Sequence, residues 1–244
     1  MITLWLLSGL CSNYFVALRE MAQLRGLRVG TAPDQLFVIA DLYQRGLLPK
    51  ACSVADFGCQ QLWGGKPADV RAFAETFNIS LRNEDQEKLG ANGAFIGHIF
   101  KAVGWNYLSF DIVEAPFCEQ FDLNSDRVAP ARLNSFDLVL NFGTTEHVMN
   151  QFNAMKALHD SAKLGGLIYS YFIRGGHMEH GLVHYSDRFV DLWLDANQYE
   201  PIWRQDFNNP GNDCTWIVVR KTLPSGFKAI VDVQLGEGLP ALRG

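Results

Sequence analysis

The stretch from Phe136 to Tyr171, "FDLVLNFGTTEHVMNQFNAMKALHDSAKLGGLIYSY", decides the fold class of this chain. It opens with the nearly continuous apolar run 136–142, and a second such run begins at the glycine pair 165–166. Runs without alternation are typical of parallel strands that are covered on both faces. Between them, apolar residues recur at steps of three and four, which predicts a helix that ends at the glycines. Strand, helix and strand in this order predict a parallel βαβ unit.

The same alternation continues on both sides of this unit. Helical patterns cover 84–105 and 186–199, and Ser186 is placed as the N-cap of the second. The turn sequence "NNPGND" (208–213) joins the last two apolar runs, which predicts an antiparallel hairpin. The remaining predicted strands are 52–57, 106–113, the weak run 117–124, 199–207 and 214–222. We therefore predict an α/β fold: a Rossmann-like, mostly parallel sheet with helices on both faces and a C-terminal antiparallel hairpin.

The residues before the first strand are predicted to form an N-terminal helical extension. "SNYFVALREMAQLRGL" (12–27) has apolar residues at helical spacing, and a second helix is expected from about Pro33 to just before Pro49. Two helices ahead of a sheet suggest a cap or a dimer element, with a homodimer through these helices as the hypothesis. The predicted domains are the extension 1–52, the sheet domain 53–222 and a C-terminal tail, 223–244.

Composition excludes several classes of protein. Of the 244 residues 48% are hydrophobic, the net charge is −5, and there is no run of Lys or Arg, so nucleic acid is not an expected partner. The five cysteines are scattered without a CxxC pair, which fits a reducing cytoplasm better than a disulfide framework or a zinc site. The opening "MITLWLLSGLC" lacks a basic start and is too short to span a bilayer, so no stable membrane insertion is expected.

Polar residues follow several of the predicted strands, at the edge of the sheet where ligands bind in open parallel folds. The first strand leads into "VADFGCQQLWGG" (54–65), where Asp56 offers a carboxylate and Gly58 lets the backbone approach a ligand closely. The second ends at Asp111, a position suited to the ribose hydroxyls of an adenosine. The strand 136–142 continues into Glu146, at a predicted helix start.

Three of these segments carry a resemblance to a known family. "VADFGCQQL" (54–62), "YLSFDIVE" (107–114) and the stretch 136–171 resemble the corresponding segments of class I S-adenosylmethionine-dependent methyltransferases of the small-molecule type. The resemblance spans roughly residues 53–222. It implies S-adenosylmethionine as the cofactor and direct in-line transfer of its methyl group to an O, N or C atom of a small-molecule acceptor.

The resemblance also implies a cofactor role for residues at each strand end. The methionyl end would lie against the first loop, the ribose at the second strand, the adenine beside the third, and the transferring methyl at the fourth. In that order, the implied cofactor-binding residues are Asp56, Gly58, Cys59 and Gln60; Asp111 and Ile112; Asp122 and Leu123; and Asn141 and Phe142.

Histidines gather after the strand 165–173, in "GGHMEHGLVHYS" (175–186). Their spacing is similar to that of metal ligands, but the segment reads as a glycine-rich loop and not as one helix face, so no metal site is expected. In the resembled family this loop lies over the acceptor pocket, where a histidine suits proton transfer near neutral pH. The predicted catalytic residues are His147 and His177, and the predicted substrate-binding residues are Glu146, His180, His184 and Tyr185.

Two departures from the family pattern leave other functions open. Gln60 and Leu62 replace loop glycines, and Asp111 follows Asp56 at a longer interval than the usual distance of about 20 residues. The excess, 66–93, is expected to form a lid or a longer helix pair. A nicotinamide-dependent oxidoreductase fits poorly, because its Gly-x-Gly-x-x-Gly loop fails here at two of three positions. The alternative from another class is a non-catalytic methyltransferase-like binding or assembly module.

Overall fold

The computed structural model describes residues 31–176, 179–209 and 212–230. The predicted helix within 12–27, the catalytic role of His177 and most of the tail therefore lie outside the described residues. Within the described ranges, no helix has the length and apolar character needed to cross a membrane. The cytoplasmic location and the homodimer stay predictions, as do the domain boundaries.

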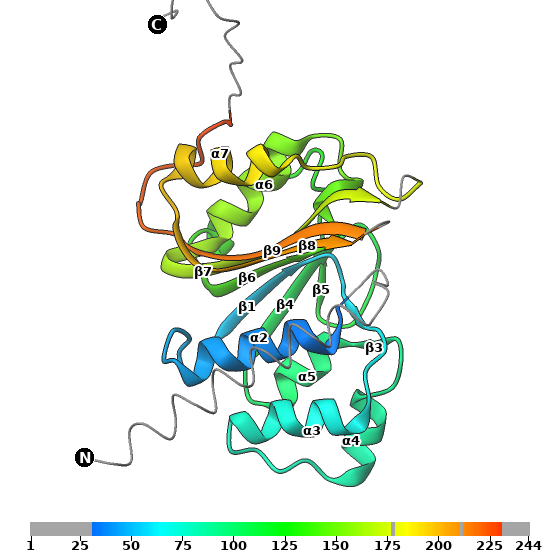
Figure 1. Ribbon diagram of the computed structural model, residues 1–244. Helices are drawn as coiled ribbons and strands as arrows, with labels where there is room; N and C mark the ends of the chain where they lie inside the picture. Colours follow the sequence, from blue (N-terminus) through cyan, green and yellow to red (C-terminus); the bar gives the residue numbers. More distant parts are fainter. Residues whose placement is uncertain (1–30, 177–178, 210–211, 231–244) are drawn as a thin grey trace, which may run out of the picture.

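A seven-stranded sheet runs through the molecule (Figure 1). Its order is β5-β4-β1-β6-β7-β9-β8. β9 is antiparallel to both β7 and β8, and the other adjacent strands are parallel, so the predicted Rossmann-like sheet with a C-terminal antiparallel hairpin is confirmed. The strands are β1 (Ser53–Phe57), β4 (Asn106–Asp111), β5 (Cys118–Gln120), β6 (Phe136–Phe142), β7 (Ala162–Gly176), β8 (Glu200–Asn209) and β9 (Asn212–Arg220).

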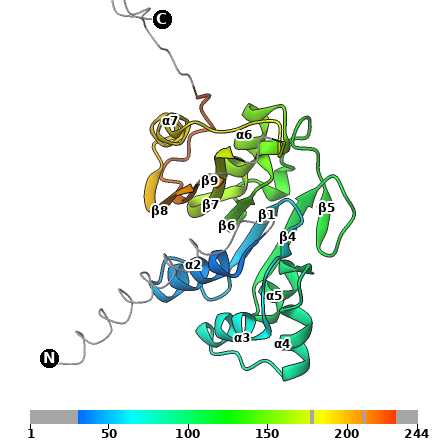
Figure 2. The ribbon, with the colours of Figure 1, turned by 45° about the vertical axis from the view of Figure 1, so that its right-hand side comes forward.

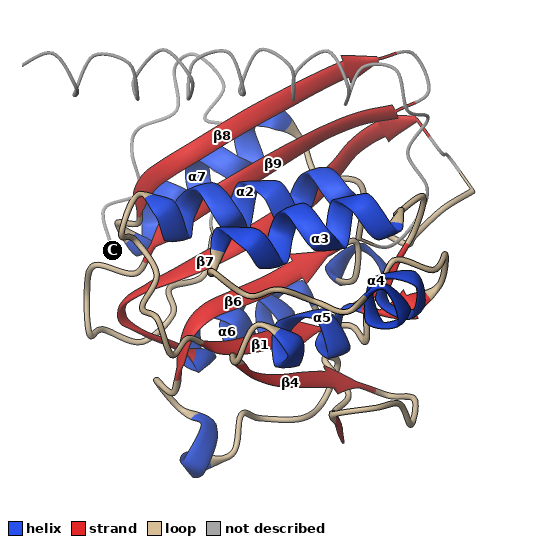
Figure 3. Ribbon diagram, turned by 90° about the horizontal axis from the view of Figure 1, so that it is seen from below, coloured by secondary structure: helices blue, strands red, loops and turns tan. Residues whose placement is uncertain are grey.

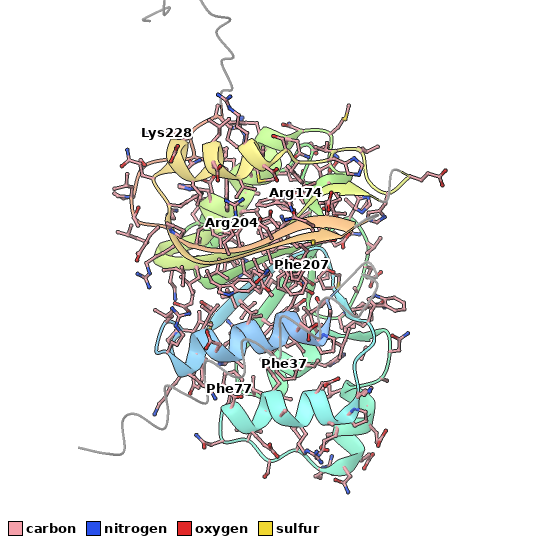
Figure 4. All side chains as sticks on the ribbon, viewed as in Figure 1. Phe37, Phe77, Arg174, Arg204, Phe207 and Lys228 are labelled. Atoms are coloured by element: carbon pink, nitrogen blue, oxygen red, sulfur yellow. The ribbon has the colours of Figure 1, made fainter. Side chains whose placement is uncertain are left out.

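Helices cover both faces of this sheet (Figures 1 and 2). Apolar strand residues alternate between two buried clusters, which explains the continuous apolar runs of the sequence: Leu138 and Leu140 point into one cluster, and Val139 into the other. Phe207 of β8 joins the first cluster (Figure 4). One face carries α2 (Pro33–Gln44), α3 (Pro67–Thr76), α4 (Asn83–Leu89) and α5 (Ile96–Ala102), and the other carries α6 (Gln151–Ser161) and α7 (Asp187–Asn197).

Seen from below, helix α2 lies in front of the sheet strands (Figure 3), and Figure 1 shows it beside the sheet. Its Leu36, Ile39 and Leu42 are buried in the same cluster as Val54 of β1 and Leu138 of β6. The helix predicted near Pro33 is therefore present. Its apolar side covers the sheet, so this helix is part of the core on this face, and the cap or dimer role given to the N-terminal helices stays a prediction.

The sequence left open whether the extra segment 66–93 forms a lid or a helix pair. It forms a helix pair, α3 and α4. Val70 and Phe73 of α3 are buried, so the segment belongs to the core on this face. Two short strands, β2 (Gln61–Leu62) and β3 (Ala94–Phe95), pair antiparallel at its base. The single helix predicted for 84–105 is wrong in this respect, since the glycine-containing stretch 90–93 and β3 divide it into α4 and α5.

The segment after β6 differs from the predicted continuous helix in a way that shapes the site. Thr145–His147 is a short 3-10 turn, and α6 begins only at Gln151, where the side chain of Asn150 accepts a hydrogen bond from the Asn153 N–H (3.1 Å). Residues 143–147 consequently form a tight turn at the strand end. The predicted cap of α7 is confirmed, because the Ser186 hydroxyl accepts from the Phe189 N–H at 3.1 Å.

Candidate functional site

A cavity of about 430 Å³ opens at the carboxyl ends of β1, β4 and β6. It lies where the strand order changes direction on either side of β1, the place where open parallel sheets bind ligands, and its size suits a small molecule. The described residues that line it come from the end of β4 and from the loops after β1, β4, β5 and β6: Gly58, Cys59, Gln60, Phe110, Asp111, Ile112, Phe121, Asp122, Leu123, Asn124, Gly143, Thr144, His147 and Val148.

Gly58 lets the loop after β1 pack against the turn after β6. Its φ is +100°, a backbone conformation that is strained for any residue with a side chain. Its N–H donates to the Phe110 carbonyl at 2.9 Å. A Cβ added at this position would lie 2.0 Å from the Thr144 hydroxyl oxygen and 2.6 Å from the Gln60 amide nitrogen. Only glycine therefore fits here.

Gln60, which stands where the family has a glycine, bridges the two loops. Its amide Nε2 donates to the Thr144 Oγ1 at 3.0 Å, and the residue is 8% exposed. Leu62, the other replaced glycine, lies on β2 and is fully buried in the core, away from the cavity lining. The two replacements thus act differently: Gln60 joins the cavity wall, and Leu62 anchors the start of the inserted segment.

Asp56 lies beneath the loop and does not line the cavity. Its Oδ2 accepts from the Tyr107 hydroxyl at 2.6 Å and from the Gln60 N–H at 3.4 Å, whereas Oδ1 has no hydrogen-bond partner among the described residues. Burial raises the pKa of Asp56 to about 8, although both hydrogen bonds act against the shift. The carboxyl group supports the loop from below.

Asp111 and Ile112, by contrast, face the cavity. The Asp111 carboxylate accepts from the Cys59 N–H at 2.8 Å and from the Val113 N–H at 3.3 Å. A carboxylate has about four lone-pair sites, so it keeps capacity for ligand hydroxyls. Ile112 is 68% exposed beside it, an apolar side chain that a bound ring would cover.

The segment from Asp122 to Asn124 forms another wall. Asp122 accepts from the Asn124 N–H at 2.8 Å, and this and further bonds from Asn124 and Ser125 hold its pKa below the ordinary value. The Asn124 side chain in turn accepts from the N–H groups of Met149 (3.0 Å) and Asn150 (3.1 Å). The wall is thereby fastened to the start of α6.

Asn141 and Phe142 lie behind the cavity surface. The Asn141 amide donates to the Thr145 hydroxyl at 3.0 Å and accepts from the Thr145 N–H at 3.2 Å, so it fixes the turn 143–147. Phe142 packs edge-on against Tyr169 in the core. Both residues shape the site without reaching its lining.

Glu146, His147 and His180 meet at the edge of the cavity. Glu146 has no exposed surface, its carboxylate oxygens accept no hydrogen bond within the described chain, and burial raises its pKa to about 7. His180 Nε2 lies 3.9 Å from Glu146 Oε1, and the His180 and His147 rings stand edge-to-face with centroids 4.6 Å apart. His147 also lines the cavity.

The other predicted substrate-binding residues lie deeper or apart. Tyr185 is buried, and its hydroxyl oxygen lies 2.8 Å from both Thr145 Oγ1 and Gln151 Oε1, which supports the turn after β6. His184 is half-buried, and its Nε2 has no hydrogen-bond partner in the part of the chain that the structure describes. The roles given to these residues and to His177 stay predictions.

Sequence reasoning missed six described residues of the cavity lining. They flank the predicted residues along the chain: Phe110, Phe121, Asn124, Gly143, Thr144 and Val148. Their position next to strand ends was a usable signal. No sequence signal indicated that His180 lies beside Glu146, because α6 and β7 separate the two residues in sequence. The histidines with metal-ligand spacing lie in one loop, whereas the partners of His180 come from the turn after β6.

No protein-family model and no curated protein matches the chain. It is similar to solved structures, among them 1,6-didemethyltoxoflavin-N1-methyltransferase of Burkholderia thailandensis with bound 1,6-didemethyltoxoflavin and S-adenosylhomocysteine (15% identity, 89% of this chain and 87% of that chain, TM-score 0.48). Another is an S-adenosylmethionine-dependent methyltransferase of Clostridium acetobutylicum (11%, 86% and 98%, TM-score 0.48). Both of these proteins are methyltransferases. At such identities the likeness concerns the fold alone.

Proposed function

We propose that the protein transfers a methyl group from S-adenosylmethionine to a small-molecule acceptor by direct in-line displacement. The observation that carries this proposal is one cavity that combines the Asp111 carboxylate with the close-approach loop at Gly58. The solved structures described above support the choice of cofactor, since one of them holds S-adenosylhomocysteine. The acceptor atom, O, N or C, stays open.

The adenosine half of the cofactor fits the wall formed by β4 and β5. Asp111 would accept hydrogen bonds from the two ribose hydroxyls, as carboxylates at this strand end do in related sheets. Ile112 and Leu123 offer apolar contact for the adenine ring, and Asp122 lies beside them as an acceptor for an exocyclic amine. The exposed Ile112 would be covered on binding.

The methionyl half fits the side of the cavity between the loops after β1 and β6. Among the described lining residues, Asp111 and Asp122 are acidic and none is Lys or Arg, which suits a ligand with a sulfonium and an ammonium group. The amide of Gln60 has a second hydrogen beyond the one donated to Thr144. We assign that hydrogen to the carboxylate of the methionyl group, a role that a glycine could not fill.

Methyl transfer places modest chemical demands on the chain. The cofactor supplies the leaving group, and the protein binds, orients and excludes water, so no enzyme nucleophile is required. Burial raises the pKa of Cys59 to about 11, and this thiol accordingly stays neutral. For an oxygen acceptor, and as long as His147 holds no metal ion, its imidazole at the cavity edge is placed to take the proton.

The second candidate is a non-catalytic module that binds a ligand in the same fold. The observation in its favour is the bond from Gln60 to Thr144, which fastens together two loops at the position of the usual loop glycine. Such a module would bind S-adenosylmethionine or S-adenosylhomocysteine without turnover of any acceptor.

Calorimetric titration with both cofactor forms tests the proposal. Asp111→Asn should weaken binding about tenfold to a hundredfold, because hydrogen bonds to a charged group contribute roughly 1.5–3 kcal/mol. Asp195→Asn, a substitution on an exposed position of α7, is the matched control and should bind like the wild type. If about millimolar ligand produces no heat and no thermal shift, the proposal is refuted. An unchanged affinity of Asp111→Asn would show that the ribose does not bind at Asp111.

A further inference from the structure

Three side chains of metal-ligand type converge at the edge of the cavity. Glu146 and His147 come from the turn after β6, and His180 comes from the loop after β7. One ligand atom from each residue lies within 4.8 Å of the other two. The residues are brought together by the sheet, since β6 and β7 are parallel neighbours that end at the same edge.

Glu146 is the unusual member of this cluster. Its side chain is fully buried, and its two oxygens accept no hydrogen bond from the described residues. A buried carboxylate without such bonds is costly unless it is protonated or meets a cation. The nearest cationic candidate in the cluster, His180 Nε2, lies 3.9 Å from Oε1, beyond hydrogen-bond distance. The group is placed to gain a charged partner.

The loop that carries His180 is fixed over Glu146 by the backbone. The Glu146 carbonyl accepts from the N–H groups of Leu182 (2.7 Å) and Val183 (3.0 Å). Gly181 has φ +77°, and a Cβ there would lie 3.1 Å from the Glu146 Cγ. The close packing holds His180, 24% exposed in its side chain, beside the carboxylate. The cluster is therefore built by the fold.

We propose that Glu146, His147 and His180 bind one divalent first-row transition-metal ion of the zinc type. Two imidazoles and one carboxylate are a ligand set that such ions favour over Mg²⁺ or Ca²⁺, which prefer oxygen. In a tetrahedral site, ligand atoms about 2.1 Å from the ion lie about 3.4 Å apart. The distance of 3.9 Å between Glu146 and His180 exceeds that value by about 0.5 Å, and no pair of ligand atoms in the cluster exceeds 4.8 Å, so binding would require the side chains to move inward.

Three protein ligands leave at least one coordination position open. Because His147 lines the cavity, an acceptor bound there would be within reach of the ion and could supply an oxygen atom to that position. This role in methyl transfer rests on the proposed function, whereas binding of the ion does not. The acceptor class is then one with a hydroxyl or carboxylate near the methylated atom.

The test is metal binding in the absence of cofactor. Full-length protein treated with a chelator is titrated calorimetrically with Zn²⁺, and the visible spectrum is recorded with Co²⁺. We expect one ion per chain, and Glu146→Gln or His180→Gln should each lower the affinity by at least about 100-fold, since loss of an outer-shell partner alone costs 10–100-fold. Thermal melting of the metal-free variants checks that both are folded; if one of them unfolds, the other decides.

His98→Gln is the matched control, because it removes a histidine from α5, outside the cluster. It should bind Zn²⁺ as the wild type does. The proposal is overturned if the wild type fails to bind one equivalent, or if His98→Gln weakens binding as much as His180→Gln, which would indicate adventitious surface histidines. Cofactor titration of the same samples separates the two proposals: metal binding without S-adenosylmethionine binding refutes only the proposed function, and the reverse refutes only the metal site.

Discussion

Carboxylates at the two edges of the sheet are treated in opposite ways. At the amino edge, Asp137 accepts from the Ser53 N–H (2.9 Å), the Ser53 hydroxyl (2.6 Å) and the Lys163 ammonium (2.8 Å). Partial burial raises its pKa, but these bonds outweigh burial and leave the pKa below its ordinary value. At the carboxyl edge, Glu146 is buried without such bonds, and its pKa is raised to about 7.

The difference shows which carboxylates stabilise the fold. A carboxylate that is satisfied within the protein stabilises the fold when ionised, whereas a buried one with few partners lowers stability and is retained for a ligand. The bonds of Asp137 make it a structural residue at the edge of the sheet opposite the cavity. Substitution of each carboxylate tests this difference.

The largest expected effect concerns Asp56 and depends on pH. Its folded-state pKa of about 8 lies above the ordinary value of 3.8, so the folded chain keeps a proton that the unfolded chain loses. Wild-type stability should therefore fall, relative to Asp56→Asn, as the pH rises from about 4 to about 8, by at most about 1.4 kcal/mol per pH unit. Urea unfolding of both proteins at pH 5.5 and 7.5 measures the difference; a wild-type stability that stays constant or rises with pH, relative to Asp56→Asn, would contradict the burial argument.

The next effect is at the satisfied edge. Asp137→Ala should lower the free energy of unfolding by about 2–3 kcal/mol, because it removes three hydrogen bonds, one of them from Lys163. Denaturant titration at pH 7 measures it. Lys163→Met serves as a companion variant and should lose less, since Lys163 is 43% exposed. Equal stability of Asp137→Ala and the wild type would remove the contrast between the edges.

A change of the opposite sign is expected at Glu146. Without metal, Glu146→Gln should leave stability unchanged or raise it by about 1 kcal/mol, because the amide carries no charge to desolvate. The same denaturant titration at pH 8 reports it, with chelator present. A loss of 2 kcal/mol or more, on the scale of a lost buried partner, would place Glu146 among the structural carboxylates.

The smallest effect is expected at the bridge between the loops. Gln60→Ala should cost about 0.5–1.5 kcal/mol of stability through the lost bond to Thr144. It should also weaken S-adenosylmethionine several-fold more than it weakens adenosine alone, if Gln60 contacts the methionyl group. Calorimetry with both ligands separates the two, and equal weakening would show that Gln60 is only a support of the cavity wall.

Much of the fold could be predicted, because buried parallel strands leave apolar runs that are visible without their partners. Every predicted strand is present, and 117–124 contains β5. The division of 84–105 was harder to foresee, since β3 exists only through its pairing with β2, whose position depends on the inserted segment. The local sequence pattern predicts the strands, whereas long-range strand pairing determines where the predicted helix is divided.

The candidate site divides along the same line. Residues that follow strands, such as Gly58 and Asp111, lie at the cavity because strand ends gather at one edge. The support given by Asp56 from below, and the meeting of Glu146 with His180, depend on side-chain packing across several elements. Neither leaves a mark in residue spacing.

The close approach of Gly58 to Thr144 has a consequence for how sequences of this kind can diverge. With 2.0 Å between the hydroxyl oxygen and the place of a Cβ, neither position can enlarge alone, and Gln60 is tied to the same oxygen. Drift at 58, 60 and 144 should therefore be concerted: a lineage that regains glycine at 60 releases Thr144 to change, whereas one that keeps glutamine must keep a hydroxyl or another acceptor opposite it. Covariation among these three positions in related sequences would reflect this contact, which a single sequence does not reveal.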